Sequence, residues 1–206
     1  CRIIPERGSW IELNVTKKDV LAVRIDQSGK FSATTLLRAM DPKYGTHSEL
    51  IRCFYPTETV KVVDGRSVGK IENKIAVTDV VYPTASDRAG EIMVESGQKI
   101  TKNVAELICT SGVTSIEVMD DVKDPIIFNT LQEDNTQSHE EALLKIYQRL
   151  RPGNPPQLEK ARALFFEKFF DTNRYRLGRV GRFRINRKLG LNVSEHEMTL
   201  RADDLI

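Results

Sequence analysis

Two segments near the start of the chain alternate between apolar and polar side chains. In WIELNV (10–15) and LAVRID (21–26), every second residue is a branched aliphatic one, which is typical of strands with one buried face. Only TKKDV separates them, so they are predicted to form an antiparallel hairpin. Packing the apolar faces together permits only every second register. We favour the register that sets Glu12 opposite Arg24, because sliding by two residues sets Glu12 against Asp26 or against an alanine.

This register decides which side chains share the polar face of the hairpin. It sets Trp10 opposite Asp26 and leaves Arg24 on the same face. A tryptophan on the wet side of a strand keeps an aromatic face available for stacking.

The rest of the chain divides by its periodicity into helical and β-rich parts. Helices are predicted over about 32–40, from Thr46 and Ser138 with capping boxes, and over about 157–170. Residues 58–122 instead hold short Val/Ile strands between Gly and Asp turns, with one helix near 101–112. The sequence therefore predicts an α+β fold, in which a mixed helical and β-hairpin domain (1–57 and 123–206) is interrupted by a small β-rich insert (58–122).

Composition narrows the class of protein. The chain has 206 residues, 40% of them hydrophobic, and a net charge of only +2, which favours a folded domain with a real core. Its three cysteines are widely spaced without a CxxC, as in a reduced intracellular protein. We expect no metal site and no bilayer-spanning helix. No set of catalytic side chains can be assembled. Both ends look cut, which suggests a piece of a longer chain.

The strongest local charge asymmetry is the run RYRLGRVGRFRINRK (174–188), which holds seven cations and no acid. With Tyr175 and Phe183 interleaved, it resembles a surface that binds a nucleic-acid backbone and stacks bases. The alternative is a solvated edge partly paired with the chain's own acids. On spacing alone, this alternative is favoured.

Two blocks of sequence resemble the lobe domain of the bacterial RNA polymerase beta subunit. The first is RIIPERGSWIEL followed by VRID and TTLLRAM, and the second is IYQRLRPGNPP, LFFEKFF and RYRLGRVGRFRINRKLGL. They stand in the family's order and cover about 2–57 and 136–206. Residues 58–122 take the place of a lineage-variable insert.

The resemblance implies a lobe module without catalytic residues of its own, part of DNA-directed RNA polymerase, a nucleotidyltransferase of the cytoplasm and nucleoid. The enzyme's magnesium is bound by another subunit, so no cofactor is expected in this stretch. In the family, the lobe forms one wall of the DNA cleft and contacts downstream and non-template DNA. The implied partners are DNA and the beta-prime, alpha and sigma subunits. A transcription factor that binds the insert is a further candidate partner.

The resemblance also assigns site residues. The Trp of the GSW motif and the Asp of the VRID motif belong to a pocket for non-template bases, which places Trp10 and Asp26 there with Arg24 beside them. Weaker contacts with the DNA backbone are expected at Arg174, Arg182 and Arg187, which fall on family positions within the basic run. One departure is QSGK after VRID, where many relatives carry a cluster of cations, so phosphate contact there should be weaker.

Two other functions stay open. A free-standing nucleic-acid-binding protein would bind DNA measurably as an isolated chain. An isolated lobe module of a polymerase is expected to bind DNA only weakly and in a salt-dependent way. A protein-docking platform would expose an apolar patch on 58–122.

Overall fold

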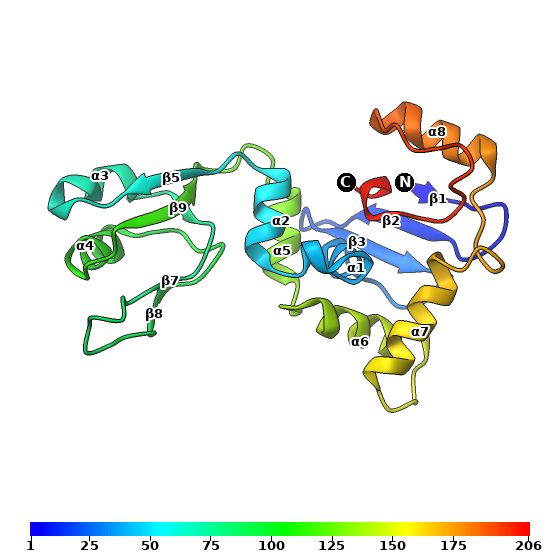
Figure 1. The fold of residues 1–206 in the computed structure, drawn as a ribbon, viewed down its shortest axis with the longest axis horizontal. Coiled ribbons are helices and arrows are strands. Elements are labelled where there is room, and N and C mark those ends of the chain that lie inside the picture. The colour runs from blue at the N-terminus through cyan, green and yellow to red at the C-terminus, as the bar shows by residue number, and fades with distance from the viewer. The chain divides into compact units, whose positions relative to one another are not determined.

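The computed structural model describes residues 1–206 and divides into two compact units. The first unit joins Cys1–Gly45 to Asn129–Ile206, and the second is Thr46–Phe128. Figure 1 shows the chain from the blue N-terminus to the red C-terminus. Each unit combines helices with small antiparallel sheets, which confirms the α+β class.

The first unit contains four strands, four α-helices and two short 3-10 turns: β1 (Arg2–Ile3), β2 (Ile11–Val15), β3 (Leu21–Ile25), β4 (Phe31–Ser32), α1 (Ala33–Met40), η1 (Pro42–Tyr44), α6 (His139–Leu150), α7 (Leu158–Phe169), α8 (Arg179–Leu189) and η3 (Ala202–Asp204). The helix α5 (Ile126–Glu133) crosses the boundary between the units. The second unit contains α2 (His47–Phe54), β5 (Glu58–Lys61), η2 (Asp64–Ser67), α3 (Val68–Ile71), β6 (Ile75–Ala76), β7 (Val80–Val81), β8 (Ile92–Val94), α4 (Lys102–Thr110) and β9 (Ser115–Met119).

The first sheet has the order β1-β2-β3-β4, with every neighbouring pair antiparallel. Ile11 pairs with Ile25, and Glu12 lies opposite Arg24, so the predicted hairpin register is confirmed. The ion pair formed by Glu12 is nevertheless with Arg2 on β1, at 3.2 Å. The register is thus the predicted one, while the edge strand β1 supplies the ion-pair partner of Glu12.

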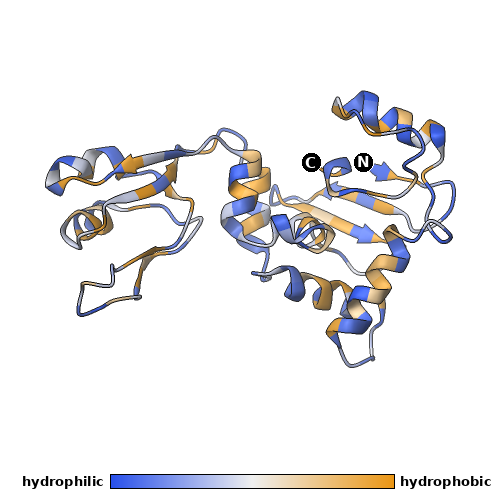
Figure 2. Ribbon diagram, viewed as in Figure 1, coloured by the Kyte–Doolittle hydropathy of each residue, from blue (hydrophilic) through white to orange (hydrophobic).

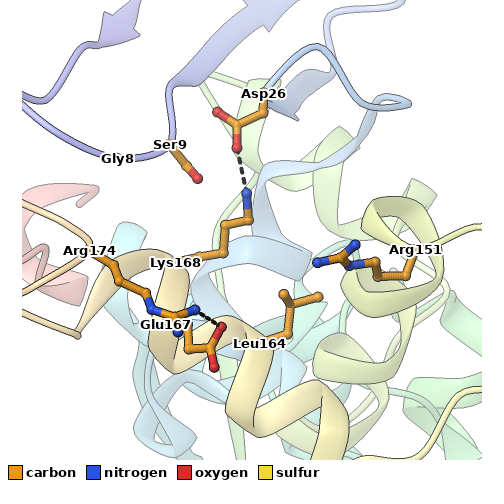
Figure 3. Close-up of a pocket in the computed structure, with 8 residues that line it drawn as sticks. All are labelled: Gly8, Ser9, Asp26, Arg151, Leu164, Glu167, Lys168 and Arg174. Carbon is orange, nitrogen blue, oxygen red and sulfur yellow. Dashed lines mark hydrogen bonds and ion pairs between the residues drawn. The ribbon is translucent and has the colours of Figure 1, made fainter.

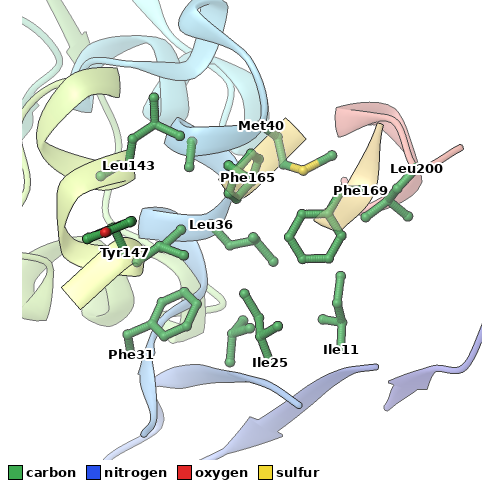
Figure 4. Close-up of a cluster of buried hydrophobic side chains, with 14 of the residues drawn as sticks. Ile11, Ile25, Phe31, Leu36, Met40, Leu143, Tyr147, Phe165, Phe169 and Leu200 are labelled. Atoms are coloured by element: carbon green, nitrogen blue, oxygen red, sulfur yellow. The ribbon is translucent and has the colours of Figure 1, made fainter. Parts of the chain in front are cut away.

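Helices α1, α6 and α7 cover one face of this sheet, and Figure 4 shows their side chains meeting those of β2 and β3. The alternation of apolar and polar positions along β2 and β3 is visible as orange and blue bands in Figure 2. The central side chains are fully or almost fully buried: Ile11, Val23, Ile25, Leu36, Leu143, Ile146, Phe165 and Phe169. In the core of the first unit, branched aliphatic side chains from the hairpin thus pack against helices that carry aromatic ones.

A buried carboxylate joins the helices of the first unit. Asp134 accepts hydrogen bonds from the hydroxyls of Thr34 and Thr35 on α1 at 2.7 and 2.9 Å, and it lies 3.4 Å from the Nε of Arg38. Burial alone raises the pKa of the Asp134 carboxyl, but hydrogen bonds from Thr34 and Thr136 and the charge of Arg38 outweigh it and hold the pKa below its usual value. The carboxylate is therefore buried in its ionised form.

The second unit has its own core. It contains a three-stranded sheet of order β5-β9-β6 and a two-stranded sheet of β7 and β8, and α4 packs against β8 and η2. The buried apolar residues of this core all fall between residues 71 and 118. The unit is wider than the expected insert of 58–122, since α2 and the start of α5 also belong to it. The insert boundaries themselves stay a prediction.

The two expected capping boxes differ. Thr46 accepts a hydrogen bond from the Glu49 amide, and the Glu49 side chain bonds back to the Thr46 amide, so this box is complete. Ser138 accepts from the Glu141 amide at 3.2 Å, but the Glu141 carboxylate accepts from the Gln137 amide instead. Only half of the second box forms.

Candidate nucleic-acid interface

The end of the β2–β3 hairpin brings Trp10 and Asp26 together. The Asp26 amide donates to the Trp10 carbonyl at 3.1 Å, and the Trp10 amide donates to Oδ1 of Asp26 at 2.9 Å. The Trp10 side of this pair is open to solvent, since the residue is 46% exposed. The hairpin thus ends in an aromatic ring and a carboxylate held side by side by the backbone.

The turn after β3 fixes the direction in which Asp26 leaves the strand. Asp26 and Gln27 both have positive φ, of 46° and 62°, and the Ser28 amide donates to the Ile25 carbonyl at 2.9 Å. Two consecutive residues with positive φ form a type I′ turn, which follows the twist of a hairpin. Aspartate tolerates this conformation better than most residues. The change from the extended strand to this turn therefore occurs at the candidate site residue itself.

The glycine of the GSW motif has a steric role. Gly8 has a φ of 120°, and a Cβ at this position would lie 2.7 Å from Cδ2 of Tyr175, closer than real side chains approach. The neighbouring Arg7 and Arg176 pair through both backbone hydrogen bonds, at 3.1 and 2.7 Å. Gly8 therefore lets the segment before Trp10 pass over a buried tyrosine. The two blocks of sequence that carry the resemblance meet at this crossing.

Lys168, at the end of α7, contacts the Asp26 carboxylate. Its Nζ donates to Oδ2 at 2.7 Å, and the two side chains are 29% and 37% exposed. Partial burial raises the pKa of the Asp26 carboxyl, but the hydrogen bonds from Lys168 and the Trp10 amide, with the nearby Ser9 side chain, outweigh it and leave the pKa below its usual value. Asp26 is therefore an ionised acceptor.

Hollows surround this contact. Two of about 390 Å³ border the Asp26–Lys168 pair, and both are also lined by Arg151 and Leu164. Figure 3 shows Lys168 reaching from α7 toward Asp26, with Arg151 on one side of it. A third hollow, of about 270 Å³, is lined by Trp10, Glu12, Asp26 and Gln27. The Asp26 carboxylate borders all three.

Arg24, expected beside Trp10 and Asp26, lies one residue before the end of β3 and opposite Glu12. It is partly buried, its Nε has no hydrogen-bond partner, and it does not line the hollow beside Trp10. The structure brings Trp10 and Asp26 together but gives Arg24 no direct part in their contact.

The expectation that Arg182 lies along DNA is corrected by its burial. Its side chain is fully buried in the first turn of α8, where Nη1 lies 2.5 Å from Oδ1 of Asp204. Its other nitrogens donate to the carbonyls of Glu197 and Thr199, at 2.8 and 2.6 Å. This arginine joins the C-terminal segment to α8, and its buried side chain is not accessible to a phosphate.

Other members of the basic run also differ from one another. Tyr175, expected as a stacking group, is fully buried and makes an edge contact with Phe169, so it is not available to a base. Arg174 is exposed but pairs with Glu167 and Asp171. Arg187 and Phe183 are exposed on α8. The run is thus neither one continuous binding surface nor a purely solvated edge.

Lys168 and Arg151 were missed by the sequence reasoning. Lys168 stands in LFFEKFF, where the aromatic residues Phe165 and Phe169 are buried. The available signal was a cation placed directly before a buried phenylalanine in this aromatic segment. The partner itself could not be read from the sequence, because α7 lies more than 100 residues after the turn that carries Asp26.

The structure gives no sign of a metal centre or a membrane segment. No three His, Cys, Asp or Glu side chains gather in an arrangement able to hold a metal ion. None of the helices combines the length and apolar character that a bilayer-spanning helix needs.

The family model described as RNA polymerase Rpb2, domain 2, matches residues 100–206, just over half of the chain. The chain belongs to this family.

Curated relatives match the whole chain, including the Trp10–Asp26 hairpin that precedes the family-model region. This chain is 71% identical over 206 residues to the DNA-directed RNA polymerase subunit beta of Rhodopirellula baltica. It is 35% identical over 217 residues to the protein of the same name in Methylacidiphilum infernorum, and 34% identical over 213 residues to that of Protochlamydia amoebophila. Each alignment covers all of this chain but only 16–17% of the relative's length.

Proposed function

We propose that the chain is a non-catalytic lobe module of a bacterial RNA polymerase beta subunit. In the assembled enzyme it forms one wall of the DNA cleft and contacts the downstream and non-template DNA. The proposal rests on the family membership and on the match of the whole chain to a part of known beta subunits. Through it, the implied partners are the other polymerase subunits and DNA, and the magnesium chemistry belongs to another subunit.

The Trp10–Asp26 contact is the observation that carries the DNA-binding part of the proposal. An unpaired base stacks on the exposed face of the indole, and the Asp26 carboxylate accepts a base N–H. The hydrogen bond from the Trp10 amide holds the Asp26 carboxylate against the backbone of the residue that carries the indole. The hollow between them and Gln27, about 270 Å³, provides the space for an aromatic base.

Charge at this site is compatible with a polyanionic strand. Both carboxylates that line the hollow beside Trp10 have cationic partners, Arg2 for Glu12 and Lys168 for Asp26. Pairing reduces the repulsion that a bare carboxylate exerts on a phosphate. Among the cations of the basic run, Arg174 and Arg187 are exposed and remain candidates for backbone contacts, whereas Arg182 does not.

The test is Trp10→Ala in the whole polymerase, on promoters that differ at one non-template base just downstream of the start site. Loss of stacking on one base is worth roughly 1–3 kcal/mol, so open-complex lifetimes should shorten by roughly 5- to 150-fold on promoters whose base stacks well. The isolated chain should keep its melting temperature within a few degrees, because the indole is half exposed. A large drop in melting temperature together with base-independent lifetimes would contradict the proposal.

The alternative of a docking platform stays a prediction for the second unit. Val81 and Ile92 face each other across β7 and β8 and are 42% and 52% exposed. They form a small apolar pair, and nothing in the structure identifies its partner.

A further inference from the structure

Lys168 lies where the core of the first unit meets the candidate base site. Its neighbour Phe169 is fully buried, and Phe165, one helical turn before it, is 3% exposed. These two rings anchor the last turn of α7 in the core, so the Lys168 side chain starts from a fixed position. From there its ammonium reaches Oδ2 of Asp26 at 2.7 Å (Figure 3).

The Asp26 carboxylate accepts two hydrogen bonds, one on each oxygen. Its Oδ1 accepts the Trp10 amide at 2.9 Å, and its Oδ2 accepts the Lys168 ammonium at 2.7 Å. An ionised carboxylate offers about four acceptor positions. The two protein donors therefore leave capacity for a further N–H donor. Trp10 directly precedes β2, so Lys168 is the one donor that comes from outside the hairpin.

The charge of Lys168 matters as much as its geometry. An unpaired carboxylate at a site crossed by a DNA strand would repel the phosphates, and this repulsion would be the same for every base. Arg151 and Arg174 also border this region, but Arg174 already pairs with Glu167 and Asp171, and neither arginine forms an ion pair with Asp26. Lys168 is the residue that balances Asp26.

We propose that Lys168 is a positioning and specificity-determining residue for the base contact of Asp26. Its hydrogen bond fixes the orientation of the carboxylate so that one acceptor position faces the base edge, and its charge offsets that of Asp26. The proposal rests on the proposed function, because it concerns how the same base site discriminates among bases.

Two simpler roles for Lys168 make different predictions. A cation that only attracts the DNA backbone would stabilise the complex with all four bases equally. A cation that only ties α7 to the hairpin would alter the melting temperature without altering base preference. A positioning residue alters the preference among bases, and it does so only while Asp26 is present.

The experiment measures open-complex lifetimes of the whole polymerase on four promoters that differ at the one non-template base. Lys168→Met removes the charge and the hydrogen bond but keeps the length of the side chain. Lys168→Arg keeps both. Lys160→Met is the matched control, because Lys160 is an exposed cation on the same helix without a contact to Asp26. Asp26→Asn keeps an oxygen that accepts the Trp10 amide and supplies the background for the double variant.

We expect Lys168→Met to reduce the ratio between the longest and shortest lifetimes roughly two- to fivefold, which is the range expected of a partly exposed ion pair. Lys168→Arg should restore most of the ratio, and Lys160→Met should leave it unchanged. In the Asp26→Asn background, adding Lys168→Met should change the ratio little, because the effects of two residues in one contact are not additive.

Each other outcome has a definite meaning. If the wild-type lifetimes do not depend on the base, the proposed function fails and this inference fails with it. If the wild type discriminates and Lys168→Met discriminates equally well, only the role of Lys168 is overturned. Uniform shortening on all four promoters, or an equal effect of Lys168→Met with and without Asp26, also overturns it and leaves the base site standing.

Discussion

At the scale of single residues, the Arg182–Asp204 pair is the contact on which the C-terminal segment of the first unit depends. Arg182→Met removes one partner and leaves the Asp204 carboxylate buried without its charge partner. Breaking a buried ion pair in this way costs about 3–5 kcal/mol. We expect chemical denaturation to show a loss of this size in the free energy of unfolding. Arg187→Met, at an exposed position five residues later, is the control and should change it by less than about 0.5 kcal/mol. Equal effects of the two variants would contradict the structural role of Arg182.

Residue type and spacing predicted the Trp10–Asp26 pairing but not the burial of Arg182. The pairing follows from a period-two pattern over a short hairpin, where one register is favoured by charge. The position of Arg182 depends on the segment after α8, which folds back and offers two carbonyls and a carboxylate. Such a long-range contact leaves no periodic signal in the run itself. For the same reason the contact between Lys168 and Asp26 could not be predicted.

At the scale of single elements, the complete capping box at the start of α2 supports a helix of only eight residues. Thr46→Ala removes the acceptor for the Glu49 amide and should lower the free energy of unfolding by about 0.5–2 kcal/mol. The prediction is checked by comparing thermal melts of Thr46→Ala and Thr46→Ser, since serine retains the cap. A Thr46→Ser variant as unstable as Thr46→Ala would show that the hydroxyl is not the stabilising group.

Helices α1, α2, α4, α6 and α7 were predicted, whereas α3, α5 and α8 were missed. Helix α5 holds eight residues and begins after Pro125, where the Ile126 amide donates to Asp124 at 3.2 Å. The Asp-Pro pair was the available signal for its start. Helix α3 has four residues, too few to show a helical period. Short helices of this kind are determined by the packing around them more than by their own sequence.

At the scale of the whole molecule, the two units have separate cores. The cluster of the first unit takes no residue from 58–122, and the cluster of the second takes its buried members from 71–118. Replacing 58–122 with a Gly/Ser linker should therefore leave a chain that still melts cooperatively, as measured by calorimetry. The melt of the original chain is the control, and the transition of the first unit is compared between the two chains. A broad, non-cooperative melt would show that the replaced segment belongs to the core.

The pH dependence of stability should come from carboxylates in both units. Asp134 and Asp26 in the first unit and Glu117 in the second all have pKa values below their usual ones. A lowered folded-state pKa contributes stability that is fully present above the unfolded pKa, about 3.9 for Asp, and is lost as the pH falls through the folded pKa. We expect a nearly constant melting temperature from pH 7 to about pH 5 and a decline below about pH 4. Asp134→Asn should flatten this decline; an unchanged slope would assign it to other groups.

The half-exposed Trp10 is also the single tryptophan of the chain. The indole emission of the isolated protein therefore originates at one place, the end of the β2–β3 hairpin. A partly hydrated indole emits at longer wavelength than a buried one and is accessible to small soluble quenchers such as iodide. The folded chain thus carries an intrinsic fluorescent reporter at its candidate base site, and the approach of a stacking ring is observable as a loss of that emission without any added label.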